Sequence, residues 1–168
     1  MKPFKIIVVF LSFLTIFGCG VYSFTGASIP PGTTSFQVNF FPNEAPLIEP
    51  GLDILFTNTL RDIVLNQTNL ELVNAGGDLM YEGEIVEYRI SPTTAQSNAT
   101  AAQNRLTIAV NVRYFDSNNS ENDFEQRFSF FFDYDGDAQL TGAQRDTAVQ
   151  EIFERITQDI FNASLANW

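Results

Sequence analysis

The chain has 168 residues and a formal net charge of −11 at pH 7, with 20 acidic and nine basic side chains. Because so negative a surface repels nucleic acid, we expect no nucleic-acid partner. The absence of histidine and the presence of a single cysteine exclude Ser-His-Asp and Cys-His catalysis and zinc sites built from His and Cys, so we expect neither an enzyme nor a cofactor-binding protein.

Residues 1–18 have the pattern of a bacterial export signal. Two lysines precede an uncharged run of twelve residues, 6–17, whereas a membrane-spanning helix needs about 20 apolar residues. The run ends in Ile-Phe-Gly-Cys, which fits a lipobox. We therefore expect cleavage before Cys19 and acylation of that cysteine, with each buried acyl CH₂ contributing about 0.8 kcal/mol to membrane binding. A secreted protein with one unpaired cysteine is the alternative.

Without the signal, the chain has the size of one domain. Both lysines leave with it, so seven arginines and 20 acidic residues give a net charge of −13. Residues 28–34 are rich in Pro, Gly and Thr, and we expect residues 19–34 to form a lipidated flexible tether to a single domain, residues 35–168. Gly20 rather than Asp follows the cysteine, and no acidic run comes next, which favours the periplasmic side of the outer membrane.

The first part of the domain predicts a strand, a helix and a short strand. Residues 35–41 alternate apolar and polar side chains, residues 51–66 have apolar side chains at helical spacing, and residues 69–73 read as a short strand. The side chains expected to face the core are Phe36, Val38 and Phe40 in the strand and Leu52, Leu55, Phe56, Leu60, Ile63 and Val64 in the helix.

Three long strands follow, at residues 79–90, 104–115 and 124–134, and their short or polar links predict an antiparallel meander. The uncharged stretch 91–103 is expected to be a flexible loop. Ile85 breaks the alternation near a glycine and indicates a bulge. The expected core faces are Met80, Val86, Tyr88 and Ile90, then Leu106, Ile108, Val110, Val112 and Tyr114, then Phe124, Phe128, Phe130, Phe132 and Tyr134.

The last element is predicted to be a helix. Thr141 and Gln144 have capping-box spacing, and an apolar stripe follows at Ala148, Ile152, Phe153, Ile156, Ile160 and Leu165. Strand, helix, strands and helix without repeats predict an α+β fold, a two-layer sandwich in which two helices cover one face of an about four-stranded, mainly antiparallel sheet.

Several stretches, taken in order, resemble the lipopolysaccharide-assembly lipoproteins (LptE-like) in their Bacteroidota-type form. They are residues 18–26 after the signal, Phe40-Phe41-Pro42-Asn43, Gln67 to Val73, Gly76 to Leu79, Asn104-Arg105-Leu106-Thr107 and the terminal Asn167-Trp168. The resemblance implies two helices on a four-stranded sheet. It also implies that the chain plugs an LptD-like outer-membrane β-barrel, assists its assembly and helps deliver lipopolysaccharide to the outer leaflet.

The arginines of the meander are the candidate contact residues. Arg89, Arg105, Arg113 and Arg127 fall on the outward parity, on the face of the sheet that the helices leave free, together with the aromatic Phe115 and Phe131. Guanidinium groups there can bind phosphates of lipopolysaccharide or carboxylates of a barrel. Cross-strand ion pairs with Glu87, Glu125 and Asp133, which share that parity, are the ordinary alternative.

Two further groups of acidic side chains have ordinary structural explanations. Glu82 and Glu84 are expected on one face of their strand and Glu87 on the other, so they form no catalytic cleft. The stretch Asp133 to Asp137 is the best calcium candidate, but it lacks the Gly and Glu of an EF-hand loop and also reads as an exposed turn. A periplasmic lipoprotein that scaffolds or activates a cell-envelope enzyme, and a lipid-binding module, remain alternative functions.

Overall fold

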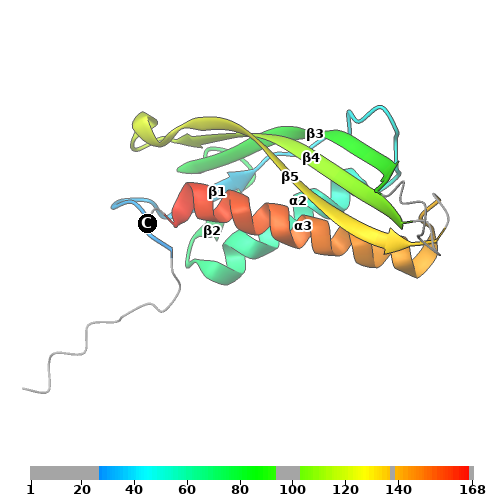
Figure 1. Cartoon of the computed structure of the whole chain (residues 1–168). Coiled ribbons are helices and arrows are strands. Elements are labelled where there is room, and N and C mark those ends of the chain that lie inside the picture. The colour runs from blue at the N-terminus through cyan, green and yellow to red at the C-terminus, as the bar shows by residue number, and fades with distance from the viewer. Residues whose placement is uncertain (1–26, 94–102, 137–138, 167–168) are drawn as a thin grey trace, which may run out of the picture.

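The computed structural model describes residues 27–93, 103–136 and 139–166. Two helices lie side by side on one face of a five-stranded sheet (Figure 1). The elements are β1 (Ser35–Val38), α2 (Leu52–Gln67), β2 (Glu71–Leu72), β3 (Leu79–Pro92), β4 (Gln103–Asp116), the short 3₁₀ helix η2 (Ser120–Asn122), β5 (Phe124–Asp135) and α3 (Gly142–Leu165). The predicted two-layer α+β sandwich is confirmed, with the two-residue β2 as a fifth strand.

The strand order is β2-β1-β3-β4-β5. The predicted meander is confirmed, because β3, β4 and β5 pair antiparallel. In contrast, β1 runs parallel to both β2 and β3, so the sheet is mixed. The helix α2 connects β1 to β2 as a parallel crossover. The strand β4, which lies in the middle of the meander, alternates as predicted, since its five inward side chains from Leu106 to Tyr114 are all buried.

A bulge in β3 corrects the predicted core face of that strand. The register with β4 shifts between Ile85 and Glu87. Before the shift, the buried side chains are Leu79, Tyr81 and Ile85, and after it Tyr88 is buried. Because one extra residue reverses the alternation, Met80 and Val86 do not lie with Tyr88 on the core face, as predicted, although the bulge itself was expected.

Phe40 was predicted to face the core, and this is wrong. Its side chain is 54% exposed, whereas Phe41 is fully buried. The strand β1 ends at Val38, and the backbone beyond it no longer alternates. The amide of Phe41 donates to the hydroxyl of Thr57 on α2 at 3.2 Å, which turns the Phe41 ring toward the helices. Its ring centroid lies 5.1 Å from that of Phe56.

The helices bury the predicted stripes with two exceptions, both on α2: Leu55, and Ile63, which is only partly buried. All six predicted core residues of α3 are buried. On α2, however, Leu55 is 41% exposed, because this side chain lies beside the groove between the helices rather than under the sheet. At the start of α3, the side chain of Thr141 makes no capping hydrogen bond, so the predicted capping box does not form.

The described part of the predicted tether, residues 27–34, contacts the domain. The amide of Ser28 donates to the carbonyl of Leu165 at the end of α3 at 2.5 Å, and Ile29 packs partly buried against the core. Further along, Asp78 Oδ2 accepts hydrogen bonds from the backbone amides of Thr34 at 2.8 Å and Ser35 at 3.0 Å, and from both hydroxyls. This carboxylate therefore joins the start of β1 to the start of β3.

We predict that Asp78 makes stability acid-sensitive. The hydrogen bonds from Thr34 and Ser35 lower the pKa of Asp78, so its contribution is present above the unfolded-state pKa of about 3.9 and is lost as pH falls through the lower folded-state value. Urea unfolding of Asp78→Asn should show lower stability at pH 7 and a shallower decline below about pH 4. Asp62→Asn, at an exposed position on α2, is the control. An unchanged acid profile in Asp78→Asn would contradict this role.

Two buried tyrosines allow a matched stability test. The hydroxyl of Tyr81 lies 2.9 Å from the Ser164 hydroxyl, whereas the Tyr114 hydroxyl, although buried, has no hydrogen-bond partner among the described residues. Burial raises the pKa of both groups. We expect Tyr81→Phe to cost roughly 1 kcal/mol and Tyr114→Phe to be neutral or stabilising. Urea unfolding measures both, and an equal loss in the two variants would show that Tyr114 has a partner.

Candidate functional site

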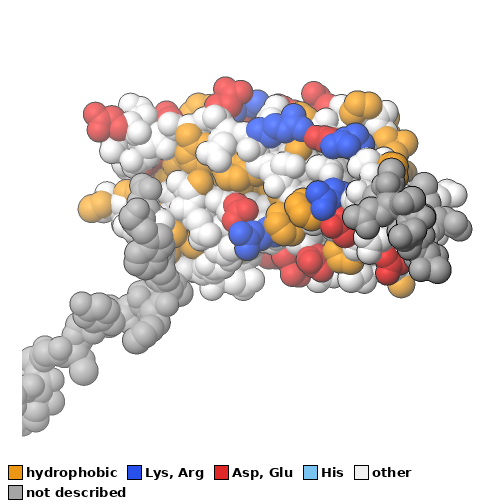
Figure 2. Space-filling model, in the orientation of Figure 1, with side chains coloured by type: hydrophobic (Ala, Val, Ile, Leu, Met, Phe, Trp, Pro, Cys, Tyr) orange, Lys and Arg blue, Asp and Glu red, His pale blue; other side chains and the backbone are white. Residues whose placement is uncertain are grey.

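The four predicted contact arginines all lie on the face of the sheet that the helices leave uncovered, here called the open face. Figure 2 shows basic side chains interleaved with acidic and apolar ones over the strands. The register of the strands brings three of these arginines, Arg105, Arg113 and Arg127, together with carboxylates of neighbouring or more distant strands. The open face comprises Met80, Glu82, Glu84, Glu87 and Arg89 of β3, Gln103, Arg105, Thr107, Ala109, Asn111, Arg113 and Phe115 of β4, and Glu125, Arg127, Ser129, Phe131, Asp133 and Asp135 of β5.

Arg105 forms the best-defined pair of the open face. It lies directly opposite Asp133 on the neighbouring strand, and its Nε and Nη2 atoms donate to the two carboxylate oxygens at 2.7 and 2.8 Å. The guanidinium carbon lies 3.6 Å from the ring centroid of Phe131, a cation–π arrangement. The bidentate bond raises the pKa of Arg105 and lowers the pKa of Asp133.

The other three arginines are also paired. Arg113 contacts Glu82 and Glu84, each at 3.1 Å. Glu87 accepts from Arg89 at 2.7 Å and from Arg127. The prediction that Glu87 lies on the other face from Glu82 and Glu84 is wrong, because the bulge reverses the alternation between them.

The open face therefore has only a small negative charge, although the formal net charge of the whole chain is −11. Its four arginines are matched by four carboxylates, and Glu125 and Asp135, which no described arginine binds, add two further negative charges. Exposed ion pairs of this kind each contribute about 0–1 kcal/mol, so a partner with its own phosphates or carboxylates can exchange with them at little cost. Phe115 and Phe131, 36% and 42% exposed, add apolar contact area.

An apolar hollow of about 480 Å³ lies at the rim of the open face, beside the bulge of β3. Pro46 and Leu47 form one side, and Val86 with Ile90 forms another. The paired side chains Glu87, Arg89 and Arg127 reach its edge, while Tyr88 completes the lining. The sequence contained no signal for this hollow, because it depends on the loop before α2 lying along β3.

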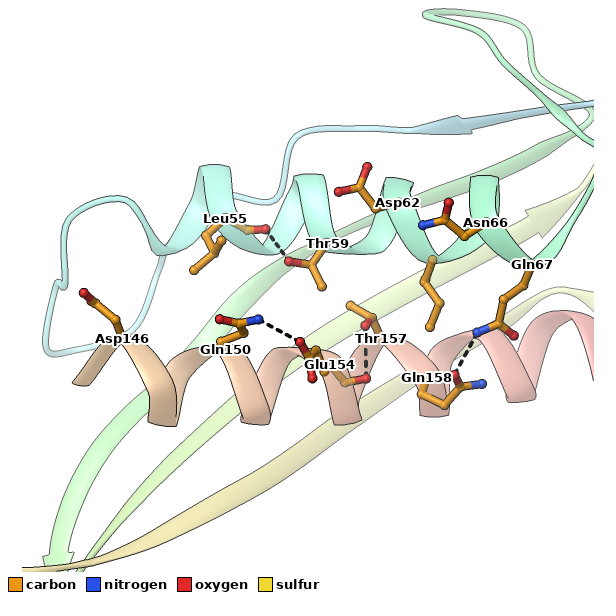
Figure 3. Close-up of a pocket in the computed structure, with 11 residues that line it drawn as sticks. Leu55, Thr59, Asp62, Asn66, Gln67, Asp146, Gln150, Glu154, Thr157 and Gln158 are labelled. Atoms are coloured by element: carbon orange, nitrogen blue, oxygen red, sulfur yellow. Dashed lines mark hydrogen bonds between the residues drawn. The ribbon is translucent and has the colours of Figure 1, made fainter. Parts of the chain in front are cut away.

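A second concavity, of about 730 Å³, is the groove between α2 and α3 on the other layer (Figure 3). A hydrogen bond from Gln67 to Gln158, 2.9 Å long, crosses it. The carboxylates Asp62, Asp146 and Glu154 line it, and no described basic residue does. Thr157 at its floor donates to backbone carbonyls of α3, so it is not an activated nucleophile.

The acidic residues of the candidate calcium loop, Asp133 to Asp137, do not form one site in the structure. Asp133 and Asp135 belong to β5, the Asp133 carboxylate is bound by Arg105, and Asp137 lies outside the described residues. No group of three or more acidic or thiol side chains suited to a metal ion occurs among the described residues.

Over the same residues, no helix has the length and apolar character required to cross a membrane.

Three solved structures are similar to the chain in their overall arrangement. The hypothetical protein CT253 from Chlamydia trachomatis is 13% identical, with a TM-score of 0.49, and the match covers 80% of this chain and 99% of that one. PelC from Paraburkholderia phytofirmans, determined as a dodecamer, is 10% identical, with a TM-score of 0.47, and the match covers 83% of this chain and 93% of that one. The rare lipoprotein B from Shewanella oneidensis is 16% identical, with a TM-score of 0.45, and the match covers 74% of this chain and 92% of that one.

The fold and the open face define a two-layer α+β domain with an ion-paired, solvent-exposed sheet surface. No curated protein matches the sequence. The model of the lipopolysaccharide-assembly family, LptE, matches residues 33–164, which is most of the chain. The protein therefore belongs to the LptE lipopolysaccharide-assembly family, and the resemblance seen in the sequence is confirmed. Its Bacteroidota-type character stays a prediction.

Proposed function

We propose that the chain is an outer-membrane lipoprotein that plugs and helps to assemble an LptD-like β-barrel of the lipopolysaccharide transport machinery. The observation that carries this proposal is the family match over residues 33–164, which spans the folded domain from β1 to the last turn of α3. In this role the protein acts by binding and has no catalytic step. Its sequence has no histidine, which agrees with such a role.

The proposal includes a lipid anchor at Cys19 after removal of residues 1–18. These residues lie outside the described part of the chain, and support comes from the lipobox and the short apolar run. Radioactive palmitate should label the wild-type protein but not Cys19→Ala, and the variant should move from the membrane to the soluble fraction. A Cys19→Ala protein that still takes up palmitate and sediments with the outer membrane would exclude this anchor.

We predict that the open face contacts the barrel through its arginines. The double substitution Arg105→Ala and Arg113→Ala removes two guanidinium forks and leaves three carboxylates without their partners, so we expect capture of the barrel from detergent-solubilised outer membranes to fall at least about tenfold, equivalent to about 1.4 kcal/mol. Arg155→Ala, which removes an arginine paired with Asp159 on α3, is the matched control. Capture that is unchanged by the double substitution would remove the open face from the proposal.

The purification also tests the function itself. Recovery of an LptD-like barrel after crosslinking in the native outer membrane is the expected result, and failure to recover it would exclude the plug function. Recovery of a cell-envelope enzyme instead would favour the alternative role of scaffold or activator. Direct contact with lipopolysaccharide requires exchange of paired arginines, since Arg89, Arg105, Arg113 and Arg127 already bind carboxylates.

A further inference from the structure

The outermost strand of the meander is a long, regular sheet edge, and charged side chains are the only usual protection that it carries. Among the described residues, β5 pairs with β4 on one side and with no strand on the other. Its 12 residues hold one unbroken register with β4 from Phe124 to Asp135, and the strand contains no Pro and no Lys. Natural proteins usually shorten, bulge, cover or charge such edges to prevent pairing with another strand. The strand β5 is neither short nor bulged, and only its charged side chains act in this way. The opposite edge, β2, follows that rule, since it has two residues.

Aromatic side chains remain accessible along this edge on both faces of the sheet. Phe131 on the open face is 42% exposed. Phe124, Phe130 and Phe132 point to the helix side, but they are only partly buried, because α3 does not cover the outermost strand completely. Arg155 of α3 reaches the ring of Phe130 at 5.6 Å. An added strand would place its own side chains beside these rings, an arrangement that stabilises cross-strand pairs.

The charge on β5 disfavours a second copy of the chain as the occupant. Glu125, Asp133 and Asp135 outnumber the single Arg127. An antiparallel pair centred on Ser129 would place Glu125 opposite Asp133, and one centred on Phe130 would place it opposite Asp135. Like charges directly opposite each other destabilise a sheet. The second register also brings Arg127 opposite Asp133, but these groups are already bound to Glu87 and Arg105.

We propose that the free edge of β5 accepts a strand from a partner protein, which extends the sheet by backbone hydrogen bonds. The strand that fits alternates basic side chains with aromatic or branched apolar side chains. The basic side chains meet Glu125 and Asp135, the carboxylates of β5 that no described arginine binds, and the apolar ones cover the half-buried phenylalanines. The inference goes beyond the proposed function, because it names a mode of binding and the chemistry of the partner segment without requiring that the segment belong to the barrel.

The experiment places a photoreactive amino acid in the full chain at Glu125, Ser129 or Phe131, in cells that make the native envelope. Mass spectrometry then identifies the crosslinked residue of the partner. We expect the partner site to move in one direction along one extended segment, by as many residues as the probe moves along β5, because paired strands keep a constant register. A probe at Asp62 on α2 is the control and should not give this ladder. Scattered partner sites, no crosslink from β5, or crosslinks to another copy of the chain would overturn the proposal.

A pair of charge variants tests the chemistry of the partner. Ser129→Lys and Ser129→Glu alter the same exposed position of β5 with side chains of opposite charge. Toward a basic strand, one like charge at close range in water costs about 1 kcal/mol, so Ser129→Lys should lower the crosslinking yield from position 125 roughly fivefold, whereas Ser129→Glu should not. Circular dichroism verifies the fold of both variants. If Ser129→Lys does not fold, the series of crosslinks from positions 125, 129 and 131 still tests whether a partner strand pairs with β5. Equal yields in two folded variants would contradict a basic partner strand.

Discussion

Substitution of Gly83 by alanine is expected to destabilise the domain by about 3 kcal/mol or more. A Cβ atom at this position would lie 2.0 Å from the backbone carbonyl oxygen of Asn111 on β4 and 2.7 Å from the Phe41 ring. The oxygen belongs to the central strand of the meander, so it has little freedom to move. Since small domains have a total stability of about 5–15 kcal/mol, this one methyl group should remove a large part of it.

Urea unfolding of Gly83→Ala measures this effect, with Thr107→Ala at a partly exposed position of β4 as the control. The double variant Gly83→Ala with Phe41→Leu separates the two clashes. If the carbonyl oxygen is the main obstacle, a smaller side chain at position 41 restores no stability. A midpoint for Gly83→Ala close to that of the wild type would show that β3 and β4 move apart easily, which contradicts the packing described above.

Phe56→Ala should be the most damaging change within the helical layer, with a cost of roughly 3–5 kcal/mol. Its side chain is fully buried, and its ring lies edge-on to Phe41 on one side and to Phe153 of α3 on the other, at 5.1 Å from each. These three rings connect the segment after β1 with both helices. The loss therefore combines a large cavity with two aromatic contacts.

Leu55→Ala is the natural control, because Leu55 is the neighbour of Phe56 on the same helix but is 41% exposed. We expect it to cost about 1 kcal/mol or less. A double-mutant cycle between Phe56→Ala and Phe153→Ala should give a coupling of about 0.5–3 kcal/mol, measured by urea unfolding. Additive effects would mean that the two rings do not stabilise each other, and the aromatic connection between the helices would be wrong.

Local patterns predicted most of the fold but not the pairing between distant strands. The alternation of β4 was sufficient to place Leu106 and Tyr114 in the core, and the stripe of α3 was sufficient to place Ile152. Which of Phe40 and Phe41 is buried depends on where β1 ends, and the hydrogen bond from Phe41 to Thr57 involves residues that are distant in the sequence. The parallel pairing of β1 with β2 and β3 likewise has no local signal.

The sequence also predicted only part of the candidate site. The alternation of inward and outward side chains was sufficient to place the four arginines on one face, because each arginine is compared only with the core residues next to it in its own strand. The partners of Arg113 were missed, since the bulge between Ile85 and Glu87 returns Glu82 and Glu84 to that face, and its position is determined by pairing with β4. The open edge of β5 could not be predicted, because strand order is a property of the whole sheet.

The contact of Ser28 with the carbonyl of Leu165 determines how the molecule can be oriented. Seven residues separate Cys19 from Ala27, a distance of at most about 25–30 Å when fully extended. The 24 residues of α3 span about 36 Å, and Ser28 is bound at the carboxyl end of that helix. If Cys19 is acylated, as proposed, its short connection to Ala27 would therefore keep this end of the domain near the bilayer. The far end, where α3 begins, would point away from the membrane surface to which the acyl chains are attached.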